Sequence, residues 1–297
     1  MKYLLIISSI FVANNLALAW DFSAKGDLQR FYTSNVNLTD TAPIADTVNA
    51  VSGYIQTKND KYRFKLKGKK EQYGKEVAND NYSLDLSLQY RRTSSDEYGL
   101  SVFKQVYNGS TIVSTDTTSD NQGGEISATF SKEFSTESSG YITPIITSRK
   151  YPKISNRTDK IYTGIIGLEH YFTQNFMVNP ELNLQKNSSS DSYYENSSWG
   201  IMLAFSYTFE DNWEFFADAG YSAVEYQGRT ITATGARGRS SVEYENQKLT
   251  SADVGVSYSF EKYVSLQVRY GTESNTSNNT SSAYKVNTTS FIIGFKF

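Results

Sequence analysis

Apolar and polar residues alternate along almost the whole chain, and this period of two constrains the fold more than any other feature. In the clearest segment, Tyr62, Phe64 and Leu66 alternate with basic residues. Such alternation is typical of β-strands that have one apolar face, whereas an amphipathic helix repeats every 3.6 residues. Because helical periodicity is nearly absent, the sequence predicts an all-β chain.

The N-terminal segment is the exception to this pattern. Lys2, a mostly apolar run and a small-residue segment precede Trp20. This order is typical of a secretory signal peptide, and the apolar run is too short to span a bilayer as a helix. We therefore predict a signal peptide at residues 1–19 and a β-barrel domain at residues 20–297, without a plug segment ahead of the first strand.

The alternation divides the mature chain into fourteen predicted strands, and the connections between them alternate in length. The strands are predicted at 20–32, 49–58, 60–69, 81–91, 98–107, 125–134, 140–149, 160–172, 175–186, 198–209, 212–226, 247–260, 262–272 and 284–297. Long loops rich in Asn, Ser, Thr and Gly are predicted at 33–48, 70–80, 108–124, 150–159, 187–197, 227–246 and 273–283, and the other connections are very short turns. Short turns on one side and long loops on the other indicate a transmembrane antiparallel up-and-down β-barrel with both termini on the periplasmic side.

Aromatic residues gather near both ends of the predicted strands. Near the short turns or the termini lie Trp20, Phe22, Tyr62, Tyr90, Tyr98, Phe172, Phe176, Phe209, Trp213, Phe260 and Phe297. Near the long loops lie Tyr32, Tyr82, Trp199, Tyr226, Tyr270 and Tyr284. Two such girdles anchor a barrel at the two headgroup levels of a membrane.

Two prolines conflict with this strand assignment. Pro144 and Pro180 fall inside predicted strands, and proline cannot donate to a β-ladder. Either β-bulges lie at these positions or the strands are misplaced, so a barrel of twelve strands stays an alternative.

Composition excludes several functional classes. A mean hydropathy of −0.49, with no long apolar run after the N-terminal segment, excludes a helical membrane protein. The chain has no cysteine and one histidine, His170, which excludes disulfide frameworks, thiolate metal sites and His-cluster zinc sites. The net charge of −2 argues against nucleic-acid binding. Because His170 has lipid-facing parity and no residue can be nominated as catalytic, we expect no enzyme, metal or cofactor.

The last eight residues, 290–297, have apolar residues at alternating positions, Phe291, Ile293, Phe295 and Phe297, and end in Phe297. They resemble the C-terminal strand of Gram-negative outer-membrane β-barrel proteins, in which a terminal aromatic residue is part of what the barrel-assembly machinery reads. In length, strand count and absence of a plug, the chain resembles the fourteen-stranded monomeric porins of the porin-G type. The resemblance implies a bacterial outer-membrane porin, in contact with lipid and lipopolysaccharide, that is a monomer. A trimer stays open because the third loop, 108–124, has glycines that allow it to fold inward.

Parity along the strands assigns charged side chains to the lumen of this barrel. The predicted pore-lining basic residues are Lys61, Arg63, Lys65, Lys67, Lys69 and Arg91. The predicted pore-lining acidic residues are Glu169, Glu181, Glu214, Asp218 and Asp253. Because the acids lie on strands roughly opposite the basic strand, we predict a basic wall that faces an acidic wall, with a transverse field across the pore. Alternatively, these charges only keep the lumen hydrated.

These features predict a channel for passive diffusion of small hydrophilic solutes through a charged lumen. One alternative is a selective channel for acidic sugars or oligosaccharides along the basic ladder, since the chain is also similar in this respect to the smaller acidic-oligosaccharide porins. Another is a non-conducting barrel whose loops bind a partner.

The sixth long loop contains Arg229, Arg237 and Arg239 among glycines. A loop at this place gates the porin-G type, so the resemblance implies a gate here, although this chain lacks the histidine pair that gives that type its pH response. The alternative is a mobile surface loop without a gating role.

Overall fold

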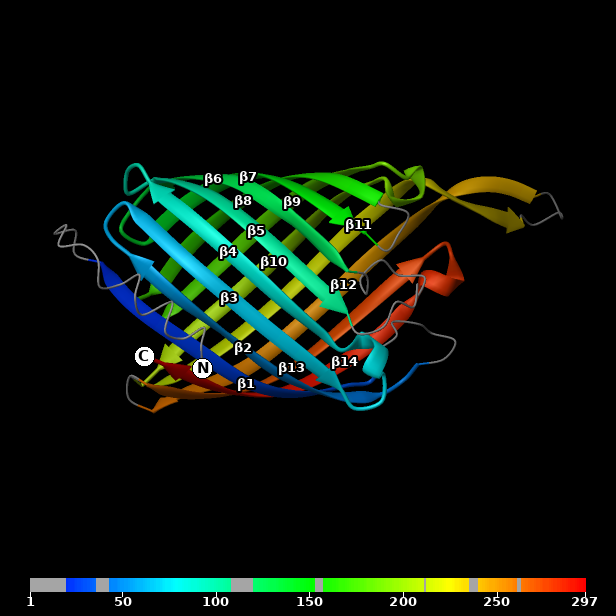
Figure 1. The fold of residues 1–297 in the computed structure, drawn as a ribbon. Coiled ribbons are helices and arrows are strands. Elements are labelled where there is room, and N and C mark those ends of the chain that lie inside the picture. Colours follow the sequence, from blue (N-terminus) through cyan, green and yellow to red (C-terminus); the bar gives the residue numbers. More distant parts are fainter. Residues whose placement is uncertain are drawn as a thin grey trace.

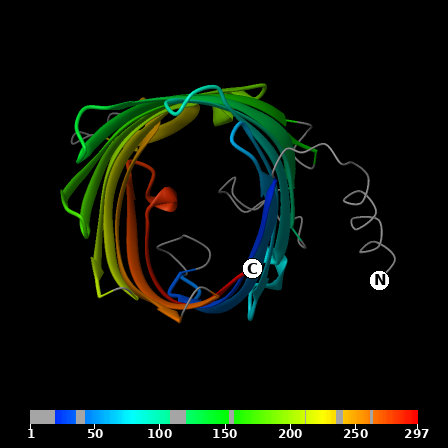
Figure 2. The ribbon, with the colours of Figure 1, turned by 90° about the vertical axis from the view of Figure 1, so that its left-hand side faces the viewer.

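The computed structural model describes residues 20–35, 43–107, 120–152, 157–210, 212–234, 240–260 and 263–297. Fourteen antiparallel strands form one closed barrel, in which each strand pairs with its neighbours in sequence and the first pairs with the last. Figure 1 shows the strands tilted along the barrel, and Figure 2 shows the ring that they form. The predicted up-and-down β-barrel is therefore confirmed. The predicted signal peptide lies outside the described residues.

The bounds of the strands and of three short 3-10 helices are as follows. The strands are β1 (Asp21–Thr33), β2 (Asp46–Lys58), β3 (Tyr62–Tyr73), β4 (Asn81–Arg91), β5 (Asp96–Tyr107), β6 (Asn121–Glu133), β7 (Ser138–Tyr151), β8 (Arg157–Thr173), β9 (Phe176–Ser189), β10 (Asn196–Phe209), β11 (Trp213–Thr234), β12 (Ser240–Phe260), β13 (Val264–Ser277) and β14 (Tyr284–Lys296). The 3-10 helices are η1 (Val77–Asn79), η3 (Ser192–Tyr194) and η4 (Thr280–Ser282). Within these described residues, no helix has the length and apolar character that crossing a membrane requires.

Every predicted strand is present, but most strands extend further than predicted at the loop end. The largest difference is in β11 and β12, which continue for 22 and 21 residues and form a ribbon beyond the barrel rim (Figure 1). The prediction of a loop is therefore wrong for residues 227–234 and 240–246, whereas residues 235–239 lie outside the described residues. Thr230, Ile231 and Thr232 explain the difference, since β-branched residues favour an extended backbone.

Both prolines lie within strands without changing the register. Pro144 of β7 stays paired with Gly164 of β8, and Pro180 of β9 stays paired with Leu203 of β10. On the other side of each proline, toward β6 and β8 respectively, the pairing is interrupted and resumes in the same register. Because proline has no N–H, each proline loses a ladder hydrogen bond to one neighbouring strand only, and the barrel tolerates this local loss. The alternative of twelve strands is wrong.

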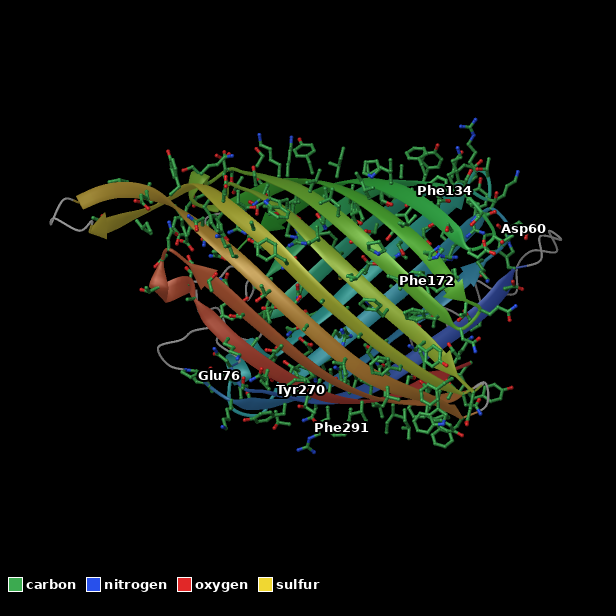
Figure 3. The ribbon with its side chains drawn as sticks, turned by 180° about the vertical axis from the view of Figure 1, so that it is seen from behind. Asp60, Glu76, Phe134, Phe172, Tyr270 and Phe291 are labelled. Carbon is green, nitrogen blue, oxygen red and sulfur yellow. The ribbon has the colours of Figure 1, made fainter. Side chains whose placement is uncertain are left out.

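The outer face of the barrel carries the apolar residues of the alternation. Leu84, Leu100, Ile126 and Ile201 are more than half exposed on this face, and Figure 3 shows Phe291 projecting from it. An exposed apolar band on the outer face of a barrel is typical of a surface that contacts lipid. The barrel wall is thus apolar outside and polar inside.

The aromatic girdle at the turn end is confirmed, because the rings contact one another from strand to strand. One continuous series runs through Phe172, Phe176, Tyr207, Phe209, Trp213, Tyr258 and Phe260, with neighbouring ring centroids 4.5 to 6.4 Å apart.

At the loop end, Tyr32, Tyr82, Trp199 and Tyr270 are exposed, as expected of a girdle. Tyr226 and Tyr284 were assigned to this girdle wrongly, because in each strand they have the parity of the inward-facing residues. The hydroxyl of Tyr284 donates to Glu273 Oε1 over 2.7 Å.

Buried side chains gather on the inner wall at the loop end. They include Val48, Tyr107, Tyr151, Arg157, Asp159, Asn187, Glu245, Asn275 and Val286. We call this set the collar. Closer to the turn end, the inward side chains are partly exposed instead. The packed core of the described barrel is therefore at its extracellular end.

The two connections at the loop end that follow β9 and β13 are stabilised in the same way. Asn187 Nδ2 donates to the carbonyl of Tyr194 over 2.9 Å, and Asn275 Nδ2 donates to the carbonyl of Ser282 over 2.7 Å. In each connection the accepting carbonyl belongs to the last residue of a 3-10 helix, and the side chain of the residue before the helix accepts a hydrogen bond from a backbone N–H of that helix. Each of these connections is thus closed by one buried asparagine.

Candidate functional site

The inner wall at β3 is strongly basic. Arg63, Lys65, Lys67 and Lys69 share the face of β3 that is opposite the exposed rings of Tyr62 and Phe64. Lys61, the first residue of the predicted basic row, lies in the turn before β3. Arg91 is the last residue of β4 and lies at the same rim.

Three lysines surround Tyr54 on this wall. Lys25 of β1 and Lys67 of β3 are the two cross-strand partners of Tyr54 on β2. Lys65 Nζ lies 4.1 Å from the centroid of the Tyr54 ring, which is a cation–π contact. We call Lys25, Tyr54, Lys65 and Lys67 the Tyr54 cluster. It concentrates three positive charges on a small part of the lumen wall.

Four acidic residues that were not among the predicted pore-lining residues lie among these cations. Lys25 pairs with Asp27 over 3.3 Å, Lys69 pairs with Glu71 over 2.6 Å, and Arg91 pairs with Glu97 over 3.6 Å. Asp85 of β4 is the cross-strand partner of Lys67. The alternation along the strands predicts an inward position for all four acids, because each lies on the polar face of its strand. Repulsion within the ladder is therefore partly relieved by local pairing.

The five predicted acidic residues have inward positions on strands β8, β9, β11 and β12. Glu169 accepts a hydrogen bond from Ser139, Glu181 accepts one from the hydroxyl of Tyr141, and Glu214 accepts one from Ser206; these bonds are 3.5, 3.0 and 2.7 Å long. Asp218 and Asp253 are direct cross-strand partners on β11 and β12.

Arg269 of β13 joins the two paired aspartates. Its Nη2 lies 3.3 Å from Asp218 Oδ2, and its Nε donates to Asp253 Oδ1. Two like charges that are directly opposite each other destabilise a sheet, and the guanidinium removes this repulsion. Arg269 was not among the predicted pore-lining residues, although it alternates with Val268 and Tyr270 and so has inward parity. This part of the predicted acidic wall therefore contains its own cation.

Two inward aromatic rings lie flat against the wall because the residue beside each of them is a glycine. A Cβ atom at Gly167 would lie 2.1 Å from the ring of Tyr141, and a Cβ atom at Gly255 would lie 2.2 Å from the ring of Phe216. Each glycine is the cross-strand partner of its aromatic residue. The space that a larger side chain would fill is thus taken by a ring that would otherwise project into the lumen.

Replacing Gly167 by alanine is expected to displace the Tyr141 ring into the lumen. The hydrogen bond from Tyr141 to Glu181 then breaks, single-channel conductance falls, and overpacking costs about 1–3 kcal/mol of stability. Conductance in planar bilayers and urea unfolding in detergent measure the two effects. Gly26→Ala is the matched control, because a Cβ atom at Gly26 meets nothing within 4 Å. An unchanged conductance in both variants would contradict the expectation.

A buried ion pair lies in the collar. Arg157 Nη2 is 3.2 Å from Asp159 Oδ2, and both side chains are 2% exposed. The Arg157 guanidinium lies between the rings of Tyr151 and Tyr194, with its Cζ 3.7 Å from each centroid. This arrangement attaches η3 to the ends of β7 and β8.

Arg229, a residue of the predicted gating loop, lies in β11 and is 6% exposed. Its guanidinium Cζ lies 3.9 Å from the ring centroid of Tyr226 and 4.4 Å from that of Tyr193, and its Nε donates to the Tyr193 carbonyl. Arg229 thus holds η3 against the base of the β11–β12 ribbon. Arg237 and Arg239 lie outside the described residues, and the gate stays a prediction.

Phe297 follows β14 and is 75% exposed. Its backbone N–H donates to the carbonyl of Ala24, and its carbonyl accepts from the N–H of Ala24, over 2.8 and 2.9 Å. The terminal residue therefore helps to close the barrel between the first strand and the last.

A closed antiparallel barrel that is apolar outside, polar inside and flanked by aromatic girdles is the fold of outer-membrane β-barrel proteins. The chain is similar over 94% of its length to the outer-membrane channel DcaP of Acinetobacter baumannii, with 97% of that chain covered, 12% identity and a TM-score of 0.52. An anion-selective porin from Comamonas acidovorans matches with 9% identity and a TM-score of 0.49, over 94% of this chain and 99% of that one. The outer-membrane protein OmpT of Vibrio cholerae matches with 10% identity and a TM-score of 0.48, over 94% and 97% of the two chains.

These similarities concern the fold. No protein-family model matches the chain, and no curated protein matches it. The chain therefore has the transmembrane barrel of the outer-membrane porins and channels, whereas the resemblance to the porin-G type stays a prediction.

Proposed function

We propose that the chain forms a water-filled channel for passive diffusion of small hydrophilic solutes across the bacterial outer membrane. The observation that carries the proposal is the exposure of Arg269, which lies inside β13 on the inner wall and has a side chain that is 41% exposed. Water therefore reaches the inside of the barrel at this depth. A barrel of fourteen strands is also too wide for its own side chains to fill, and the structurally similar DcaP is described as a channel.

The lumen charges favour small anions in this proposal. Asp218 and Asp253 are neutralised in part by Arg269, whereas Lys65 and Lys67 make no ion pair within the described part of the chain. The Tyr54 cluster thus places two lysines without an ion pair, Lys65 and Lys67, side by side on the described wall. A focused positive potential raises the local concentration of anions and so their rate of entry.

A channel for acidic sugars or oligosaccharides is the second candidate. Its support is the regular spacing of Arg63, Lys65, Lys67 and Lys69, which lie about 6.6 Å apart along β3. Such a row can pass a chain of carboxylates from one cation to the next. Competition of a uronic-acid oligomer with chloride current, stronger than that of a neutral oligomer of equal length, distinguishes this candidate.

We propose no covalent chemistry, although the structure contains one serine–histidine contact. Ser138 Oγ lies 2.8 Å from His170 Nδ1, and the His170 ring packs against Phe172 with centroids 4.4 Å apart. The neighbouring carboxylate of Glu137 accepts from Thr136 Oγ1 over 2.7 Å. A catalytic triad instead needs a carboxylate that orients the imidazole. A lipase and peptidase screen of the purified protein tests this part.

Assembly into the membrane is proposed to depend on Phe297, read by the barrel-assembly machinery, and the channel is proposed to act as a monomer. The exposed position of Phe297 at the β1–β14 closure supports the first part.

Planar-bilayer recording of the purified protein tests the proposed function. We expect discrete open steps and, under a salt gradient, a reversal potential of the sign that anion preference gives. A correctly folded barrel that produces no current would overturn the channel and favour a loop-mediated binding role. Current with a cation-selective reversal potential would keep the channel and overturn the anion preference.

A further inference from the structure

The outward charges of the barrel are distributed unevenly between its two ends. On the outer face at the loop end, exposed lysines include Lys70, Lys104, Lys150, Lys160, Lys186 and Lys248. Within the described strands, Glu225 is the one acid on that face at that end. At the turn end, Lys132 and Asp96 balance each other. The barrel thus presents a positive surface to the outer leaflet alone.

Three of these lysines lie on neighbouring strands and form a patch. Lys150 of β7 pairs with Thr158 of β8, two residues from Lys160, and Lys186 of β9 pairs with Tyr162, two residues on the other side of Lys160. Diagonal neighbours of this kind are about 7–8 Å apart. All three side chains are exposed, and none makes an ion pair within the described residues. We call Lys150, Lys160 and Lys186 the lysine patch.

The lysine patch lies at the level of the lipid headgroups. Tyr162, the direct partner of Lys186, is 46% exposed on the same face, and Ile166 of the apolar band lies four residues further along β8 toward the turn end. Aromatic residues of this kind mark the boundary between acyl chains and headgroups. Long lysine side chains at this boundary extend toward the polar layer. Ser148 and Ser188 add hydroxyl groups on the same face.

We propose that the lysine patch binds the phosphate groups of a phosphorylated glycolipid in the outer leaflet. Three ammonium groups at this spacing repel one another unless an anion lies among them, and the wall around them offers no carboxylate to do so. Phosphate oxygens accept charge-assisted hydrogen bonds from several lysines at once. The acyl chains of the same lipid then cover the apolar residues below Tyr162, so that one molecule satisfies both the charged and the apolar part of this surface.

Native mass spectrometry of the detergent-purified full barrel tests the proposal, with bis-phosphorylated lipid A and dephosphorylated lipid A as probes. We expect the wild-type protein to retain the bis-phosphorylated lipid. The variant with Lys150→Gln, Lys160→Gln and Lys186→Gln is expected to bind it more weakly by on the order of a hundredfold, at roughly fivefold for each lysine. The matched control, with Lys70→Gln, Lys104→Gln and Lys248→Gln, removes the same charge from strands that are not adjacent and is expected to lose far less.

Three results would overturn the proposal: equal binding by the two triple variants, equal binding of dephosphorylated lipid A, or displacement of the lipid by inorganic phosphate at equal concentration. The last result would identify a site for free phosphate. Heat-modifiable mobility on gels verifies that each variant is folded. Conductance of the patch variant is expected to equal that of the wild type, because the three side chains are outside the pore. Failure of this proposal is therefore distinguishable from failure of the proposed channel.

Discussion

A channel in which Lys65 and Lys67 are both replaced by glutamate is expected to prefer cations, whereas the wild-type channel is expected to prefer anions. Both lysines belong to the Tyr54 cluster, and the substitutions change the charge of this part of the wall from strongly positive to negative. Lys25 keeps its partner Asp27 and cannot compensate for the change. The sign of the reversal potential under a salt gradient is the measurement.

The size of this effect follows from Coulomb's law. Two unit charges 4 Å apart in bulk water interact by about 1 kcal/mol, and the double substitution changes the wall by about four unit charges. Salt at physiological concentration screens roughly half of this interaction over such distances. The interaction energy of a permeating anion with this wall is therefore expected to become less favourable by about 2 kcal/mol, which corresponds to about a thirtyfold fall in the permeability of the anion.

Two further variants control for this result. Lys65→Arg with Lys67→Arg keeps the charge and is expected to keep the anion preference. Lys58→Glu with Lys61→Glu makes the same change of charge at the exposed rim of the barrel and is expected to shift the reversal potential less, without changing its sign. An unchanged reversal potential in the variant with Lys65→Glu and Lys67→Glu would contradict the hypothesis that the Tyr54 cluster controls ion permeation.

Arg157→Ala is expected to destabilise the barrel more than any other single substitution considered. The change leaves the carboxylate of Asp159 buried without its guanidinium partner, with only the hydroxyl of Ser189 at 2.7 Å and the amide of Asn187 at 3.5 Å. Removing one partner of a buried ion pair costs about 3–5 kcal/mol. Urea unfolding of the detergent-solubilised protein measures the loss of free energy of unfolding.

Arg91→Ala is the matched control for Arg157. Arg91 also pairs with an acid, Glu97, but over 3.6 Å and with half of its side chain exposed, so its loss is expected to cost less than about 1 kcal/mol. The double variant Arg157→Ala with Asp159→Ala is expected to recover part of the stability, because the uncompensated charge is gone. Equal losses in the Arg91 and Arg157 single variants would contradict the importance of burial in the collar.

The membrane-spanning part of the barrel was predictable because lipid on one side and water on the other impose a strict alternation. The prediction failed where that contrast ends. Above the membrane both faces of a strand are polar, so the segment that begins with Arg157 and Asp159 was interpreted as loop, and the collar was missed. Pro144 and Pro180 wrongly suggested misplaced strands for a different reason. Each proline interrupts the pairing with one neighbouring strand only, so the strand itself is kept.

Parity also explains which site residues were found. Lys65, Asp218 and Glu181 lie in segments with a clear apolar face, and their inward position follows directly. Arg269 and Asp85 have the same signal and were overlooked. Arg229 has no such signal, because the β11–β12 register shifts between Glu225 and Thr230 and the alternation cannot be continued across the shift. Its neighbours Tyr226 and Tyr193 come from β11 and from η3, a contact that local sequence does not show.

Among the described residues, the ribbon of β11 and β12 extends furthest beyond the barrel rim (Figure 1). A strand of 22 residues has a contour of about 73 Å at 3.3 Å per residue, whereas about 9–11 residues suffice to cross the bilayer. About half of each strand therefore stands clear of the lipid, and the side chains near its end, among them Val242 and Tyr244, are among the most exposed apolar groups of the chain. An antibody, a phage tail fibre or a neighbouring cell that approaches the bacterium meets this ribbon before it meets the pore, so immune and phage selection would act on residues that have no part in permeation.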